Sequence, residues 1–277
     1  MKLGQATGLQ IAFFTFAILL LAVPASDYAA KVFSTSPEGR KAIGSVLHFV
    51  IAAIIVFGVA PLRRHSMAML RTPVPAERRW EVGTVTIAKA LLFALATAGG
   101  VALWNWSLGG AERLSHRVSM QATAATEMAN ALSASGFLRL ALVSAVAPVM
   151  EEIVFRGFLY RAWERRWGWA ASTLLTSAVF ALYHASFFSS FVSSVLFVAI
   201  YRRTGSLRAP IAVHAAYNFA LWYPLLGQAV FPRSADAAGN LSAWWPQLSA
   251  LGLATVLVPW YVWLSRRPYM AGNERSI

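Results

Sequence analysis

The sequence predicts an all-α integral membrane protein, a polytopic bundle of about eight transmembrane helices. Hydrophobic residues make up 58% of the 277 residues and charged residues only 13%. A soluble domain carries about 25% charged residues, so this chain has too few charges to cover a surface that faces water. Apolar runs long enough to cross a bilayer recur along the chain, and the polar residues within them follow helical spacing.

Each predicted span is a run of about 20 mostly apolar residues. The stretch from Trp167 to Tyr201 contains no Asp, Glu, Lys or Arg, and it is too long for one span. We therefore expect two helices there, joined by a tight turn near Ser186 to Ser190. The other expected spans are Leu9 to Ala25, Ile43 to Leu62, Val85 to Trp104, a helix from Phe137 through Glu151 to a turn near Arg165, Leu207 to Leu226, and Trp244 to Leu264.

Positive charges predict the orientation of these spans. Lysine and arginine gather in alternate loops, which are the N-terminus and residues 63–79, 161–166, 202–208 and 266–275. Because cytoplasmic loops carry the excess of Lys and Arg, both termini are expected in the cytoplasm. We expect the protein in the bacterial inner (cell) membrane.

Three segments are expected along the chain: residues 1–135 with N-terminal spans and loops, a core at 136–228, and an outside loop, last span and tail at 229–277. Within the outside loop 105–136, the run Gln121 to Ser135 favours a short surface helix. The first apolar run also resembles a secretory signal peptide, whose cleavage would leave seven spans.

The formal net charge of +13 does not indicate nucleic-acid binding. The basic residues form short clusters between apolar runs, which is typical of cytoplasmic loops and of contact with anionic lipid headgroups. The expected partners are therefore the lipid bilayer and a membrane-associated protein or peptide substrate, with no nucleic acid. The chain has no cysteine, which excludes disulfides, thiolate metal sites and a cysteine nucleophile.

Ionisable residues inside membrane spans are costly, and each is a candidate functional residue. Three predicted helices carry them, in the runs EEIVFRG, FALYH and HAAYN. Residues four apart share a helix face. The candidate residues are Glu151, Glu152, Arg156, Phe180, His184, His214 and Asn218.

The spacing predicts different tasks for the two adjacent glutamates. Glu152 and Arg156 are four apart in the order that favours an ion pair. Glu151 points about 100° away and is the candidate general base, with His184 sharing or holding the water. His214 and Asn218 lie on one helix face, where both can donate hydrogen bonds to an oxyanion.

At these residues the sequence resembles the CPBP family, the CAAX-protease and bacteriocin-processing membrane enzymes also called Abi. The resemblance covers about residues 140 to 222 and rests on three motifs: Glu151-Glu152-x-x-x-Arg156, Phe180-x-x-x-His184 and His214-x-x-x-Asn218. It implies a glutamic endopeptidase that needs no cofactor. Glu151 and His184 would activate water, His214 and Asn218 would form the oxyanion hole, and Glu152, Arg156 and Phe180 would support them.

Three other functions are also compatible with the sequence. The weakest of them is a lipid-modifying enzyme, whose apolar cavity could hold an acyl or prenyl chain. Glu151, His184 and His214 could ligate zinc as a metallopeptidase, although no HExxH run is present. A transporter or a non-catalytic membrane partner, such as an immunity protein, could also keep glutamate and histidine in its spans.

Overall fold

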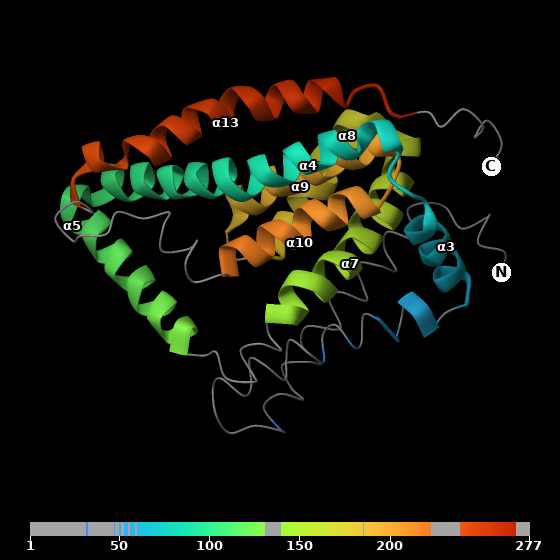
Figure 1. Cartoon of the computed structure of the whole chain (residues 1–277), viewed down its shortest axis with the longest axis horizontal. Helices are drawn as coiled ribbons and strands as arrows, with labels where there is room; N and C mark the ends of the chain where they lie inside the picture. Colours follow the sequence, from blue (N-terminus) through green and yellow to red (C-terminus); the bar gives the residue numbers. More distant parts are fainter. Residues whose placement is uncertain are drawn as a thin grey trace. The chain divides into compact units, whose positions relative to one another are not determined.

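The structure is a computed structural model that describes residues 32, 47, 50, 53, 54, 56–58, 60–130, 140–184, 186–222 and 239–269. Within those ranges the regular elements are helices, and no strand is present (Figure 1). This confirms the all-α prediction for the described part of the chain. The residues divide into two compact units, and each is described by itself.

Unit 1 comprises Met1–Arg79, Ala145–Ala212 and Leu264–Ile277. Its centre is a helical run that turns back on itself and packs α8 against α9. The elements are α3 (Ala60–Arg71), η2 (Ala76–Arg78), α7 (Ala147–Glu152), the π-helix η5 (Ile153–Tyr160), α8 (Arg161–Leu182) and α9 (Phe187–Thr204).

The run through α7, η5 and the start of α8 breaks at Gly168, where φ is 74° and ψ is 172°. Glycine adopts positive φ without the penalty that a Cβ would bring, so the helix can reverse there. The sequence predicted a turn near Arg165, and the observed break lies three residues further on. The remainder of α8 then carries Phe180 and reaches Leu182.

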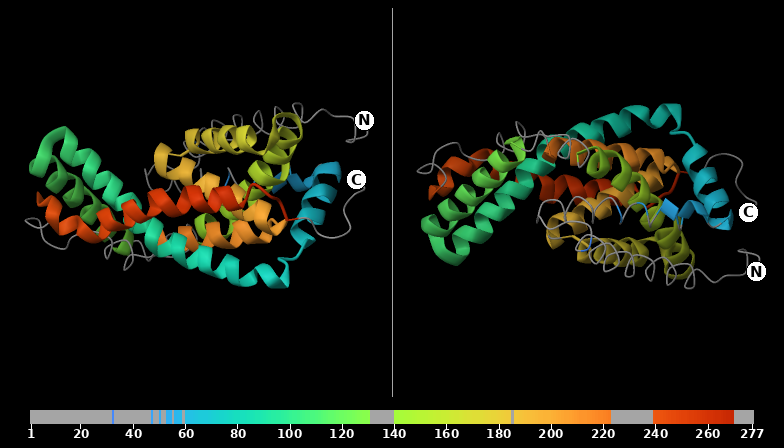
Figure 2. Two further views of the ribbon diagram at one scale, coloured as in Figure 1. Left: turned by 90° about the horizontal axis from the view of Figure 1, so that it is seen from above. Right: turned by 90° about the horizontal axis from the view of Figure 1, so that it is seen from below.

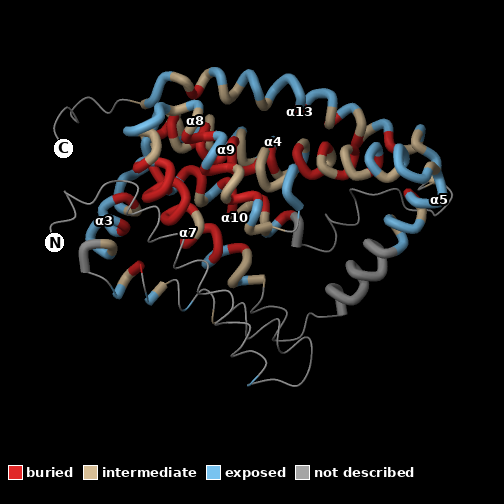
Figure 3. Tube along the Cα trace, turned by 180° about the vertical axis from the view of Figure 1, so that it is seen from behind, coloured by how far each residue is buried: buried red, intermediate tan, exposed pale blue. Residues whose placement is uncertain are grey.

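A short turn joins α8 to α9. The backbone N–H of His184 donates to the carbonyl oxygen of Ala181 at 3.0 Å, and α9 begins at Phe187. The two helices lie side by side (Figure 2, yellow to orange), as expected for the uncharged stretch from Trp167 to Tyr201. Residues 193–200 of α9 are all buried (Figure 3).

Unit 2 comprises Trp80–Ser144 and Val213–Trp263. The α-helix α13 runs along the continuous helix formed by α4, η3 and α5 (Figure 1). A second part of the unit comes from α10, which contributes residues from Val213 onward. The elements are α4 (Arg79–Ala88), the π-helix η3 (Lys89–Phe93), α5 (Ala94–Asn130), η4 (Leu142–Val146), α10 (Arg208–Trp222), η6 (Leu241–Trp244) and α13 (Trp245–Leu264).

The third predicted span extends beyond its expected end at Trp104. Helical geometry continues until Gly109 and Gly110, where the backbone leaves helical φ and ψ, and α5 then resumes to Asn130. The run from Gln121, expected as a separate short surface helix, is thus the end of a longer helix as far as Asn130. Residues 131–139 lie outside the described ranges.

Two helices in the described part of the chain are long and apolar enough to cross a membrane, Ala76–Ser119 and Leu241–Leu264. They correspond to the third and the last predicted spans. The span at Leu9 to Ala25 and most of the span at Ile43 to Leu62 fall outside the described residues. The count of eight spans therefore stays a prediction.

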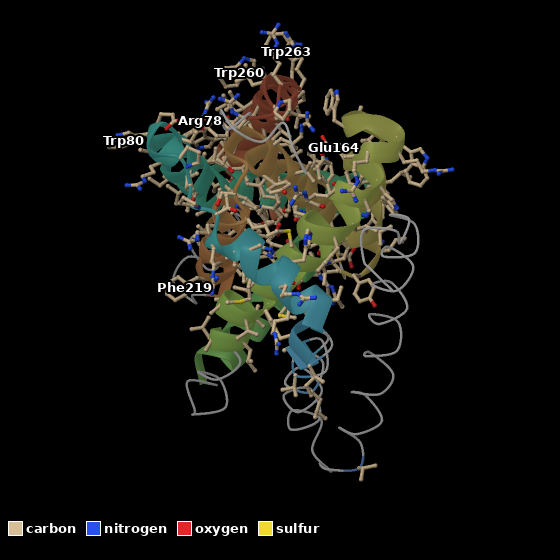
Figure 4. All side chains as sticks on the ribbon, turned by 90° about the vertical axis from the view of Figure 1, so that its right-hand side faces the viewer. Arg78, Trp80, Glu164, Phe219, Trp260 and Trp263 are labelled. Carbon is tan, nitrogen blue, oxygen red and sulfur yellow. The ribbon has the colours of Figure 1, made fainter. Side chains whose placement is uncertain are left out.

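Large apolar side chains of unit 2 are exposed. Trp80, Trp260 and Trp263 point outward from α4 and α13 (Figure 4). Trp80 is 87% exposed, and the two tryptophans of α13 are each more than half exposed. Exposed apolar surface of this kind is typical of helices that face lipid, where tryptophan is enriched at the membrane–water interface.

Candidate active site

The first feature of the candidate site is a buried ion pair in unit 1. Arg156 Nη1 donates to Glu152 Oε1 at 3.0 Å, and both side chains are 0% exposed. The partners sit one turn apart, across the junction between α7 and η5. The pair expected from their spacing is therefore present. Removing either partner would leave a buried charge without compensation, which is strongly destabilising.

Arg156 also ties this helix to α9. Its Nη2 donates to the hydroxyl of Ser194 at 2.7 Å and to the carbonyl oxygen of the same residue at 3.1 Å. The guanidinium lies 4.8 Å from the ring centroid of Phe180 and 5.1 Å from that of Phe197. Arg156 thus contacts three helical segments and fixes their spacing around Glu151.

Glu151 faces His184 across a short gap. Glu151 Oε2 lies 3.9 Å from His184 Nε2. The glutamate side chain is 24% exposed and the histidine side chain 34% exposed, whereas the neighbouring Glu152 is fully buried. The two adjacent glutamates therefore have different environments, as the sequence predicted. Of the two, Glu151 is the partly exposed side chain, although its Oε2 atom, which faces His184, is itself buried.

Phe180 fixes the imidazole of His184. The Nδ1 atom of His184 is 2.7 Å from the carbonyl oxygen of Phe180, and the two rings stack with centroids 4.3 Å apart. Because a carbonyl oxygen can only accept, the proton of this hydrogen bond belongs to Nδ1. In the neutral ring, Nε2 then carries a lone pair, and this is the nitrogen that faces Glu151.

This geometry suits a water molecule held between two acceptors. A distance of 3.9 Å is too long for a direct hydrogen bond between Glu151 and His184. A water in contact with both atoms can donate one hydrogen to the carboxylate and one to Nε2. Its lone pairs then point away from both groups, towards a substrate. The arrangement can act as a general base, since a positioned carboxylate takes the proton as the water attacks.

His214 and Asn218 lie on α10, one turn apart, in the part of the helix that belongs to unit 2. His214 is buried, and Asn218 Nδ2 donates to the carbonyl oxygen of Val143 at 3.0 Å. This bond orients the amide. An amide nitrogen carries two hydrogens, so one donation to Val143 is compatible with a second donation to an oxyanion. Convergence of these two residues with Glu151 stays a prediction.

The far end of the α8–α9 hairpin is fixed by another buried arginine. Arg202 contacts Glu164 and donates from Nη1 to the hydroxyl of Tyr160 at 2.7 Å. It also donates to the backbone oxygens of Ser265 and Arg266, just after α13, at 2.8 and 3.0 Å. Anchored at Arg156 and again at Arg202, the hairpin holds His184 at a defined height relative to Glu151.

Some residues of this region were not predicted from the sequence. Ser194 and Phe197 contact Arg156 but occupy an apolar helix without a motif. Lys89 is buried within unit 2, and its position inside a predicted span was a signal that could have identified it. The sequence motifs identified the residues that form each pair, but they did not identify the residues that hold those pairs in place.

Comparison with known protein families gives a match for the region that contains the candidate site. Residues 133–220 match the family described as Type II CAAX prenyl endopeptidase Rce1-like. The matched segment contains all three motifs and supports the resemblance found in the sequence. A search of curated proteins found no match, and a search of solved structures found none either.

Proposed function

We propose that this chain, whose residues 133–220 match the family of type II CAAX prenyl endopeptidases, is an intramembrane endopeptidase. The family implies a peptide hydrolase that acts on a membrane-associated protein, and together with the two apolar helices it indicates an integral membrane protein. The bond cleaved would lie near the C-terminal or membrane-proximal part of a protein or peptide. The observation that carries the proposal is the 3.9 Å approach of Glu151 to His184.

The first step of the proposed reaction is attack by water. Glu151, which faces His184 across a gap of 3.9 Å, removes one proton as the water oxygen forms a bond to the carbonyl carbon of the substrate. His184 accepts a hydrogen bond at Nε2, because its Nδ1 proton is committed to Phe180. The carbonyl double bond becomes a single bond, and its oxygen gains a negative charge.

The second step is collapse of this tetrahedral intermediate. His214 and Asn218 would donate hydrogen bonds to the oxyanion, which is worth several kcal/mol in a site that excludes water. The carbon–nitrogen bond then breaks, and the proton held by Glu151 passes to the leaving amine. Glu152 and Arg156 take no part in bond changes and hold the helix that presents Glu151.

The proposed reaction needs no metal ion. Glu151 supplies the base, and an amide such as that of Asn218 is a good hydrogen-bond donor but a poor zinc ligand. In the zinc scheme, Glu151, His184 and His214 would be the ligands, and His214 would offer a lone pair in place of a proton. Activity should survive EDTA and phenanthroline, with no stoichiometric zinc in the purified protein. The zinc scheme would be favoured if the protein held one zinc per chain, if chelation removed the zinc and the activity together, and if added zinc restored the activity.

The proposed orientation places Gly205 in the cytoplasm and Gln121 outside, in a bacterial inner membrane. The natural chain has no cysteine, so single cysteines at these two positions can be labelled without background. Labelling of both from one side of the membrane would contradict this orientation.

The experiment that tests the activity compares the wild-type protein with Glu151→Ala. Each purified protein is incubated with a membrane proteome, and newly formed peptide termini are identified by mass spectrometry. New termini that appear with the wild type and not with Glu151→Ala would support the proposal and identify substrates. Identical termini in both samples would refute it.

A further inference from the structure

A buried lysine lies within the third predicted span and has no part in the reaction proposed above. Lys89 is 2% exposed and opens the π-helical turn η3 in unit 2. An ionisable residue at such a position is costly to maintain in a membrane, so it indicates a functional role. Single π-helical turns also occur frequently at functional sites, because they displace a side chain from the regular helix face.

Two aromatic rings hold the ammonium group. Lys89 Nζ lies 3.5 Å from the ring centroid of Tyr217 and 4.2 Å from that of Phe93. The two rings pack edge to face, with centroids 5.7 Å apart. Such cation–π contacts stabilise the ammonium. Neither ring carries a formal charge.

The position of Tyr217 brings this charge to the donor face of α10. Tyr217 precedes Asn218, whose amide is oriented by Val143, and follows buried His214 by three residues. Residues three apart on a helix are neighbours, with about 5–6 Å between their Cβ atoms. Unit 2 therefore carries two hydrogen-bond donors on one face of α10 and an ammonium group against the ring of Tyr217 beside that face, a combination that recognises an anion.

We infer that Lys89 binds the terminal carboxylate of the peptide substrate, an inference that rests on the proposed function. In a CAAX-type tail, three residues follow the cysteine, and an extended chain of three residues spans about 10 Å. The ammonium lies 3.5 Å from the ring centroid of Tyr217, a neighbour of His214 on α10, so we expect a carboxylate at the end of such a tail to reach it. The flexible butyl stem lets the ammonium turn from the ring faces to the carboxylate.

The test measures peptide binding in a protein that does not cleave, so it is independent of catalysis. The Glu151→Gln protein is titrated with a fluorescent farnesylated peptide that carries three apolar residues after its cysteine. The peptide is made as the free acid and as the C-terminal amide. The acid should bind about 10- to 100-fold more tightly, as expected for a charge-assisted hydrogen bond.

Substitution of Lys89 should remove this preference. In Lys89→Met the acid and the amide should bind with equal affinity, and the affinity for the amide should stay near that of the parent. Lys89→Arg should retain the preference for the acid. The matched control is Arg113→Met, which removes an exposed positive charge from the same unit and should leave the ratio unchanged. Because the ratio compares two peptides on one protein, a loss of folded material does not change it.

Several outcomes would overturn the inference. These are equal binding of acid and amide to the parent protein, binding of neither, or an acid preference that survives Lys89→Met. An amide peptide that ends in aspartate tests the other source of a carboxylate. If it binds as tightly as the free acid, Lys89 recognises an acidic side chain and the assignment to the chain terminus is wrong. An acid preference that depends on Lys89, in a protein whose wild type cleaves nothing, would support this inference and refute the proposed function.

Discussion

The helix pair α8–α9 in unit 1 and the helix pair α5–α13 in unit 2 are joined by different contacts. In unit 1, Arg156 on η5 donates to Ser194 on α9, and hydroxyl groups line the buried faces of α8 and α9. In unit 2, Gly99 lies against the backbone of Gln247, and buried alanines with flanking leucines form the neighbouring contact. Small residues allow close helix packing in membranes, whereas buried polar groups form specific hydrogen bonds.

This difference separates a packing interface from one that positions chemistry. The α5–α13 interface gains its stability from the close approach of backbones, and no candidate catalytic residue lies in it. The α8–α9 pair packs against η5, whose Arg156 carries the charged network beside Glu151 and His184. We therefore expect substitutions in unit 1 to lower stability because a buried charge loses its partner. Substitutions at α5–α13 should lower stability because the helices can no longer pack closely.

The largest expected loss of stability follows Glu152→Gln. This change leaves Arg156 buried without its ion-pair partner, which costs about 3–5 kcal/mol. Thermal unfolding in detergent measures the effect. The double variant Glu152→Gln with Arg156→Met removes both charges and should recover part of the loss. If Glu152→Gln is as stable as the wild type, the network is not what holds unit 1 together.

Gly99→Ala tests the packing interface of unit 2. An added Cβ would lie 2.4 Å from the carbonyl oxygen of Gln247, which is backbone and cannot turn away. The helices must separate, at about 2–3 kcal/mol. The neighbouring Gly100 has nothing within 4 Å of an added Cβ, so Gly100→Ala is the matched control and should unfold as the wild type does. Equal melting temperatures of Gly99→Ala and Gly100→Ala would contradict close packing at Gly99.

Ser194→Ala weakens the anchor of Arg156 on α9. The hydroxyl hydrogen bond of 2.7 Å is lost, but the carbonyl contact of the same residue remains, so we expect a loss of about 1.5 kcal/mol. Ser177 is the control, because its hydroxyl is also buried yet makes no hydrogen bond with the described residues. Ser177→Ala should be neutral in the same unfolding measurement. A larger loss in Ser177→Ala than in Ser194→Ala would argue against the anchor.

Among these predictions, the smallest effect belongs to an exposed contact near the chain end. Tyr269 donates its hydroxyl to Glu77 Oε1 at 2.8 Å. The pKa of Glu77 is lowered below 4.5 by hydrogen bonds, first from the backbone N–H of Glu77 and then from the hydroxyl of Tyr269. The same hydroxyl bond raises the pKa of Tyr269 above 10.0. The contribution of Glu77 to the free energy of unfolding is present above pH 4.5 and is lost as pH falls through its lowered pKa. The contribution of Tyr269 is present below pH 10.0 and is lost as pH rises through its raised pKa.

Tyr269→Phe should therefore change the melting temperature only slightly near neutral pH, because an exposed pair contributes little. The loss of stability above pH 10.0 should become smaller in this variant, and the loss at acid pH should persist in part, since the backbone hydrogen bond of Glu77 remains. Melting curves across the pH range measure both. A decrease at neutral pH as large as that of Glu152→Gln would reverse the order expected from burial.

Local spacing made part of this architecture predictable. The ion pair of Glu152 with Arg156 and the stacking of Phe180 with His184 are contacts between residues four apart, and helix geometry alone predicts them. Contacts between distant segments were not predictable. Ser194 is one hydroxyl among several in an apolar run, and nothing in its neighbours marks it as the partner of Arg156.

The partners of Lys89 escaped prediction for a related reason, although its charge inside a predicted span marks it as a candidate functional residue. Its contact with Tyr217 joins segments that are far apart in the sequence, and an aromatic ring is a frequent residue in any membrane span. The break at Gly109 and Gly110 was missed because apolarity ends at Trp104, whereas helical hydrogen bonding continues. Hydropathy predicts where lipid ends, and it does not predict where a helix ends.

The most direct test of the account is a comparison of the two adjacent glutamates in one assay. Glu151→Gln and Glu152→Gln are each purified, their melting temperatures are measured, and cleavage of a substrate identified with the wild type is followed per folded molecule. The account predicts that Glu151→Gln melts as the wild type does and cleaves nothing, whereas Glu152→Gln melts earlier and retains cleavage. Cleavage at the wild-type rate by Glu151→Gln would contradict the assignment of Glu151 as the base.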